Sequence, residues 1–172
     1  MESRTLSITE RRLEAIRRHS LYQTSMHRLL ELEQSRIFCR HGMEHLLDVA
    51  RIAYIRSLER ELPLSRDLIY AAALLHDIGK WRQYEDGTPH ELASEQIAGE
   101  ILWSLPESLR FSSEETRQIL TAIRGHRRLR PDPEPLEALL YESDKASRAC
   151  FCCPALDECN WSDEKKNMEI NI

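Results

Sequence analysis

The feature that most limits how this chain can fold is its shortage of strand-forming residues. A single valine, Val49, and five glycines occur among 172 residues, whereas leucine, isoleucine, alanine, glutamate and arginine are abundant. The abundant types are mostly good helix formers, and few β-branched residues remain to build strands. The sequence therefore predicts an all-α protein, a compact helical bundle with a short cysteine-rich C-terminal extension.

Length and charge restrict the function. The 172 residues, 41% of them apolar, suffice for one core of ordinary size. The formal net charge of −5 provides no general attraction to nucleic acid or to anionic lipid. The opening residues lack the apolar segment of a secretion signal, and no stretch is apolar for long enough to span a membrane. We therefore expect a cytoplasmic protein without a membrane partner, and nucleic acid is a disfavoured ligand.

Apolar periodicity places the helices. Residues 9–36 predict two helices, divided near Ser20 and Gln23, which have the spacing of a capping box. Ser65 is expected to cap a helix that ends at His76 and Asp77, with Gly79 as its stop signal. Ser112 and Glu115 form a second predicted capping box. Further helices are expected over 41–60, 90–105, 112–126 and 134–149.

Several predicted helices carry histidine or aspartate where the side chains can face one core. Imidazole and carboxylate together are the ligands of borderline or hard divalent metals, and burying such groups is costly unless they are paired or bound to metal. A shared metal site would account for their placement on apolar faces. The residues concerned are His45, His76, Asp77, His90, His126 and Asp144.

The segments HLLDVARIA (45–53), LLHDIGK (74–80) and YESDKASR (141–148) resemble the signature of the HD-domain metal-dependent phosphohydrolases. The resemblance implies that His45, His76, Asp77 and Asp144 bind the primary metal. His90 and His126 lie where two-metal members, such as the HD-type symmetrical diadenosine tetraphosphate hydrolases and the HD-GYP phosphodiesterases, place further ligands. A GYP triplet is absent. One or two divalent ions are expected, with Fe, Mn, Zn, Mg, Ni and Co as candidates. The expected division is 1–36 for N-terminal helices, 37–149 for the HD domain and 150–172 for the tail.

These ligands predict hydrolysis by a metal-activated water. Asp77, if it bridges two ions, would hold and orient that water, and Lys80 is the second candidate catalytic residue. Substrate phosphate would be held by basic side chains, for which the candidates are Lys80, Arg124, Arg127, Arg128 and Arg148. His41 is expected to orient a ligand or to have a structural role, and His19 and His27 are expected to be solvated.

The cysteines form a second candidate metal site. Cys150, Cys153 and Cys159 have the spacing C-x2-C-x5-C, and Cys39 precedes His45 by six residues just as Cys150 follows Asp144 by six. If His45 and Asp144 meet, Cys39 can supply a fourth thiolate, which leaves Cys152 as the spare. The spacing is similar to the [4Fe-4S] arrangement of endonuclease III-type glycosylases and RecB-like nucleases. A [4Fe-4S] cluster, structural zinc and free thiols all stay open.

The sequence as a whole indicates a metal-dependent hydrolase of a phosphate ester or anhydride, with a nucleotide as the expected small substrate. Phosphomonoesterase, phosphodiesterase and dinucleoside polyphosphate hydrolase are the candidate activities. One alternative is a regulatory module that senses a nucleotide or redox state without turnover. Another is an iron-sulfur nuclease, which the net charge of −5 disfavours. The sequence does not predict an oligomeric state.

Overall fold

The protein is helical throughout the part described by its structure, a computed structural model that covers residues 6–170. No strand occurs among these residues, which confirms the all-α prediction. None of the described helices combines the length and apolar character needed to cross a bilayer. The helices are α1 (Ile8–Arg18), α2 (Ser20–Leu32), α3 (Met43–Glu59), α4 (Arg66–Leu75), α5 (Lys80–Glu85), α6 (His90–Ser104), α7 (Ser113–Gly125) and α8 (Pro135–Ala146), with short 3-10 turns η1 (Glu107–Leu109), η2 (Cys150–Cys152) and η3 (Asp163–Lys165).

Helix starts follow local chemistry, with one correction. The predicted capping box at α7 is confirmed: Glu115 N donates to Ser112 Oγ at 3.1 Å and Ser112 N donates to Glu115 Oε2 at 2.7 Å. The box predicted at Ser20 and Gln23 is wrong. The cap of α2 is His19, whose Nδ1 accepts from Leu21 N at 3.2 Å while its Nε2 lies 2.9 Å from Ser104 Oγ. His19 is therefore a half-buried cap rather than a solvated side chain.

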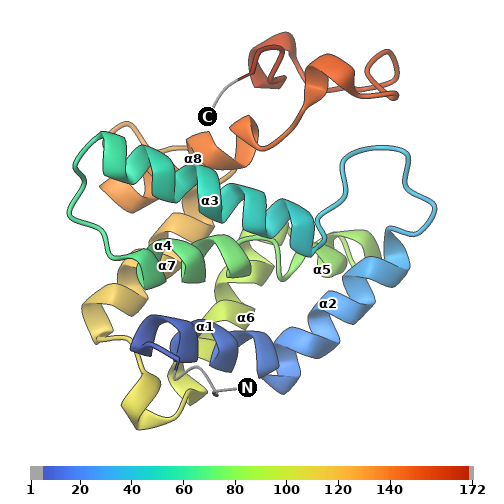
Figure 1. Ribbon diagram of the computed structural model, residues 1–172. Helices are drawn as coiled ribbons and strands as arrows, with labels where there is room; N and C mark the ends of the chain where they lie inside the picture. The colour runs from blue at the N-terminus through green and yellow to red at the C-terminus, as the bar shows by residue number, and fades with distance from the viewer. Residues whose placement is uncertain (1–5, 171–172) are drawn as a thin grey trace, which may run out of the picture.

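Helices α3, α4, α7 and α8 pack around one core, and α6 covers α7 (Figure 1). Helix α3 contacts both α4 and α8, while α1 and α2 lie on the opposite side of α4 from the C-terminal tail. Each fully buried leucine or isoleucine contributes about 1.5–3 kcal/mol. The largest such side chains include Leu46, Leu75, Ile78, Ile119 and Ile123. This core fixes the helix ends that carry the candidate site.

Gly79 brings the end of α4 close to the start of α6. A Cβ at this position would lie 2.4 Å from Ala93 C and 2.4 Å from Ser94 N, which are backbone atoms of α6. Gly79 N also donates to Ser94 Oγ at 2.9 Å. Gly79 is expected as the stop signal of the helix before it, but α4 already ends at Leu75, and Gly79, with a φ of −96°, is the N-cap of α5. Glycine is needed here for close backbone approach.

The division into 1–36, 37–149 and 150–172 stays a prediction. Helices α1 and α2 pack on the core, as expected for an N-terminal layer. The first five residues of the predicted N-terminal segment and the last two of the tail lie outside the described residues.

Candidate metal centre

The first group of candidate ligands joins three elements: α3, the turn after α4, and α8. His45 Nε2 lies 3.3 Å from His76 Nε2 and 3.3 Å from Asp144 Oδ1. Asp77 Oδ2 lies 3.2 Å from His76 Nε2 and 3.5 Å from His45 Nε2. All four side chains are buried, and one donor atom from each lies within 4.8 Å of the others. This spacing suits a single ion bound by two imidazoles and two carboxylates.

The second group shares Asp77 with the first. His90, the first residue of α6, and His126, which ends α7, place their Nε2 atoms 3.1 Å apart. Asp77 Oδ1 lies 3.3 Å from His90 Nε2 and 3.6 Å from His126 Nε2. One oxygen of Asp77 thus faces each pair of histidines, which is the geometry of a carboxylate that bridges two ions.

Backbone carbonyls select which ring nitrogen of each histidine faces inward. His76 Nδ1 lies 2.7 Å from Ala73 O and His126 Nδ1 lies 2.5 Å from Ile123 O, so in both rings Nδ1 carries the proton and donates. His90 Nδ1 lies 2.5 Å from Gln83 Oε1, and His45 Nδ1 lies 3.1 Å from Ser147 Oγ. When the rings are neutral, the lone pairs of Nε2 therefore face each other across both groups, an arrangement that a bound cation stabilises.

Buried acceptors without donors test whether a metal fits. Asp77 Oδ1 and Asp144 Oδ1 are inaccessible to solvent and accept no hydrogen bond from the described residues. Buried polar atoms of this kind are costly unless a cation or donor reaches them. Arg148 also directs its Nη2 toward the group, 2.9 Å from His45 Nε2 and 3.6 Å from Asp144 Oδ1. The carboxylate oxygens and imidazole nitrogens thus lie around a position that attracts positive charge. These residues fit a divalent metal.

Protonation favours metal binding by the two carboxylates and by His90 but opposes it at His76. Burial alone would raise the pKa of Asp77 and Asp144, but the neighbouring histidines outweigh it and hold both pKa values well below the usual range. Burial, with the positive charge of Lys80, lowers the pKa of His90 to about 2. Burial also opposes charge on His76, yet Asp77 and Asp144 raise its pKa to about 10, so a proton competes with metal there.

His41 connects the site to a buried carboxylate that sequence reasoning missed. Glu33, only 1% exposed at the end of α2, accepts from His41 N at 2.7 Å and from Tyr84 Oη at 2.7 Å, and its Oε1 lies 2.5 Å from His41 Nδ1. His41 Nε2 lies 4.0 Å from Asp77 Oδ2. Glu33 therefore orients the His41 ring toward the carboxylate that both groups share.

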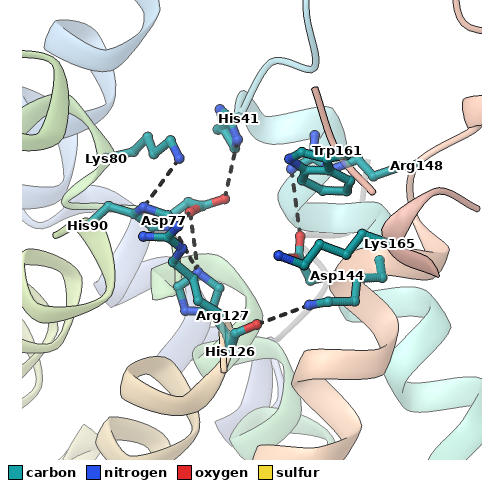
Figure 2. A pocket seen from close by; sticks show the side chains of 11 residues that line it. His41, Asp77, Lys80, His90, His126, Arg127, Asp144, Arg148, Trp161 and Lys165 are labelled. Atoms are coloured by element: carbon teal, nitrogen blue, oxygen red, sulfur yellow. Dashed lines mark hydrogen bonds and ion pairs between the residues drawn. The ribbon is translucent and has the colours of Figure 1, made fainter. Parts of the chain in front are cut away.

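A strongly basic pocket opens above the two groups (Figure 2). Asp77, His90 and His126 line one side, and Asp144 and Arg148 line the other. Five cationic side chains line the pocket together with Trp161 of the tail: Lys80, Arg127, Lys145, Arg148 and Lys165. A pocket of this charge above a metal site favours an anionic ligand that carries phosphate or carboxylate groups.

The structure brings most of the predicted phosphate ligands to this pocket. Lys80 lies there with Nζ 3.2 Å from His90 Nδ1, and Arg127 and Arg148 also line it. Arg124 is not among the lining residues, and its exposed guanidinium instead pairs with Glu95 of α6 at 2.9 Å. Arg128 is also outside the pocket lining.

Sequence reasoning missed Lys145, Trp161 and Lys165. Lys145 follows Asp144 directly, which was an available signal. Trp161 and Lys165 depend on the path of the tail, for which the sequence holds no local signal.

The cysteines lie away from this pocket, at the junction of the loop before α3 with the tail. All five are free thiols. Cys150 is buried, Cys39, Cys153 and Cys159 are half-buried, and Cys152 is exposed. Whether they hold a metal stays a prediction.

The fold and these groups define a helical protein with a buried histidine and aspartate cluster that could bind a divalent metal. Residues 42–150 match the HD domain family. An uncharacterized protein of Clostridium beijerinckii is 47% identical over 140 residues, which cover 81% of this chain and 85% of that protein. A crystal structure of a predicted HD superfamily hydrolase from an uncultured Thermotogales bacterium has the same fold, with a TM-score of 0.62 and 17% identity over 88% of this chain and 82% of that one. The chain belongs to the HD domain family.

Proposed function

We propose that the protein is a metal-dependent hydrolase of a phosphate ester or anhydride, with a nucleotide as its substrate. The observation that carries this proposal is the position of Asp77 between two pairs of inward-facing histidine Nε2 atoms, 3.3 Å apart in one pair and 3.1 Å apart in the other. His45, His76, Asp77 and Asp144 would hold one ion, and Asp77, His90 and His126 would hold the second.

Bound divalent metal lowers the pKa of water toward neutrality and offsets negative charge on a phosphoryl group. The protein's own residues supply the negative charge that holds the metal and the positive charge that orients the substrate. Asp77 and Asp144 remain ionised because the histidines hold their pKa values low. Lys80 and Arg127 lie on the His90 side of the pocket, where their charges would bind non-bridging phosphate oxygens and orient the substrate (Figure 2).

Trp161 supports a nucleotide as the substrate class. Its ring lines the pocket beside Arg148 and Lys165, so a flat aromatic face lies next to positive charge (Figure 2). Stacking of a base on an aromatic side chain contributes about 1–3 kcal/mol. A nucleotide would satisfy both features, with the phosphates near the metal groups and the base against Trp161.

Phosphate release from a panel of nucleoside phosphates, cyclic nucleotides and dinucleoside polyphosphates tests the proposal. The assay uses Mn, Fe, Co, Ni, Zn and Mg in turn. We expect Asp77→Asn to reduce turnover at least about a thousandfold, because both groups lose their shared carboxylate. Asp48→Asn is the matched control: this exposed carboxylate on α3 pairs only with Arg51, at 3.4 Å, among the ion pairs of the described residues.

Two results would contradict the proposal. Wild-type turnover by Asp77→Asn would show that the two metal groups take no part in the reaction. Tight nucleotide binding by the wild-type protein, with no turnover in the presence of any of the six metals, would show that the protein is a nucleotide-sensing module and not an enzyme.

A further inference from the structure

The tail after α8 winds in three-residue turns that bring its cysteines to one side. Cys153 N donates to Cys150 O at 3.1 Å, Leu156 N donates to Cys153 O at 3.2 Å, and Cys159 N donates to Leu156 O at 3.2 Å. In such turns every third side chain points the same way. Residues 150, 153, 156 and 159 are buried or half-buried and Cys152 is exposed, although Ala155, outside this register, is buried as well.

Cys39 approaches the same side from the loop before α3. Arg148 Nη1, at the end of α8, donates to Arg40 O at 3.0 Å, and Arg36 Nε donates to Cys39 O at 2.9 Å. These bonds hold the loop next to the start of the tail. Ile37 and Phe38 of this loop line one cavity together with Pro154 and Ala155 of the tail, so the two segments pack against each other. Cys39 therefore lies at the same junction as the tail cysteines, although it precedes Cys150 by 111 positions.

We propose that Cys39, Cys150, Cys153 and Cys159 bind one metal centre, a [4Fe-4S] cluster, which anchors the tail to the HD domain. The C-x2-C-x5-C spacing with a remote fourth cysteine is the basis for a cluster, and a single ion would need the thiols to move closer together. Tetrahedral zinc with bonds of about 2.3 Å holds its sulfur ligands about 3.8 Å apart. Within the described chain, three or more metal-binding donor atoms lie within 4.8 Å of one another only in the two histidine and aspartate groups. A cluster accepts wider spacing because each thiolate binds a different iron.

The anchor has a consequence for the pocket. Trp161 and Lys165 follow Cys159 closely in the chain, and both line the pocket over the metal groups. Beyond Cys159, the hydrogen bond from Asn167 Nδ2 to Ala146 O, at 3.0 Å, ties this segment to α8. A cluster would therefore hold the chain on the Cys159 side of Trp161, as this hydrogen bond holds it on the other side. It would do so whether or not the HD site turns over a phosphate.

Metal and sulfide analysis of the full-length protein, purified without oxygen, tests the cluster. We expect about four acid-labile sulfides per chain and broad visible absorption. Sulfide separates this centre from iron at the HD site, which brings none. Cys39→Ser and Cys153→Ser should each lose most of the sulfide, whereas Cys152→Ser, the matched control, should keep it.

Three outcomes would overturn the assignment. Wild-type protein without sulfide contains no cluster, whatever the variants do. A wild-type sulfide content in Cys39→Ser would show that Cys39 is not the fourth ligand. One zinc per chain without sulfide replaces the cluster with a structural zinc site. The wild-type measurement keeps the test decisive even if Cys39→Ser fails to fold.

Hydrogen exchange tests the anchoring role without any need for activity. We expect amides at 160–167 to exchange at least about tenfold faster in Cys39→Ser than in the wild type, with little change in the core of α7. Cys152→Ser should match the wild type. Equal exchange at 160–167 in Cys39→Ser and the wild type would show that the cysteines do not hold the tail.

Discussion

Replacing Gly79 with alanine tests whether close backbone approach builds the second metal group. The new Cβ would lie 2.4 Å from Ala93 C and Ser94 N, whereas ordinary contacts begin at 3.4 Å, so α6 must move by about 1 Å. The contacted atoms are backbone and cannot rotate away. Overpacking of this kind costs about 1–3 kcal/mol. We expect the upper end, about 3 kcal/mol, which lowers the Tm by about 6–12 °C.

The same displacement should act on metal content. His90 begins α6, and its Nε2 lies 3.3 Å from Asp77 Oδ1. Metal-ligand distances tolerate errors of about 0.2 Å. A shift of 1 Å at α6 should therefore weaken the Asp77, His90 and His126 group, while His45, His76 and Asp144 lie on other elements. Thermal unfolding and metal titration, each with wild type alongside, measure the two effects.

Gly99→Ala is the matched control on the same helix. Its Cβ would find its nearest neighbour, Leu120 Cδ1, at 3.8 Å, an ordinary contact. Alanine in a helix is more favourable than glycine by about 0.8–1.0 kcal/mol, so this variant should melt about 2–4 °C higher than the wild type. A Gly79→Ala protein that melts within 2 °C of the wild type and binds both ions would refute the steric argument.

Three further changes test the surroundings of the site. His126→Ala should lower the bound metal from two ions to one by elemental analysis, and two ions in the variant would contradict its role. Burial lowers the pKa of Lys145 to about 8, so its positive charge is present below that pH and is lost above it. The KM for an anionic substrate should therefore rise above about pH 8 in the wild type but not in Lys145→Arg. Identical pH profiles of KM for the two proteins would contradict this role of Lys145. Glu33→Gln should lower stability by about 1.5–3 kcal/mol, because buried hydrogen bonds from His41 lose their charged acceptor. An unchanged Tm would show that this charge is not needed.

Features that depend on neighbours in sequence could be predicted. The cap at Ser112 and Glu115 involves residues three apart, so the sequence contains both partners. The all-α fold followed from the scarcity of strand formers. The order of His45, the His76 and Asp77 pair, and Asp144 indicated the histidine and aspartate groups, because buried ionisable residues on apolar faces need a common partner.

Features that depend on where a helix ends or on packing between distant segments could not be predicted from the sequence. Arg124 and Arg127 belong to one basic run, but α7 ends at Gly125, so Arg124 stays on the helix and pairs with Glu95 while Arg127 follows the helix end and lines the pocket. Glu33 meets His41 through the fold of the loop after α2, and Trp161 reaches the pocket through the path of the tail. Neither placement has a periodic or local signal.

The shared carboxylate of Asp77 has a thermodynamic consequence. Its Oδ2 faces His45 and His76 while its Oδ1 faces His90 and His126, so two ions would be held by one rigid anion. Whatever free energy the first ion adds to or removes from the affinity for the second, the second must change the affinity for the first by the same amount. If the protein binds two ions as proposed, a metal titration has to be fitted with a coupling constant between the sites, and exchange of the metal in one site would alter the measured affinity of the other by that coupling.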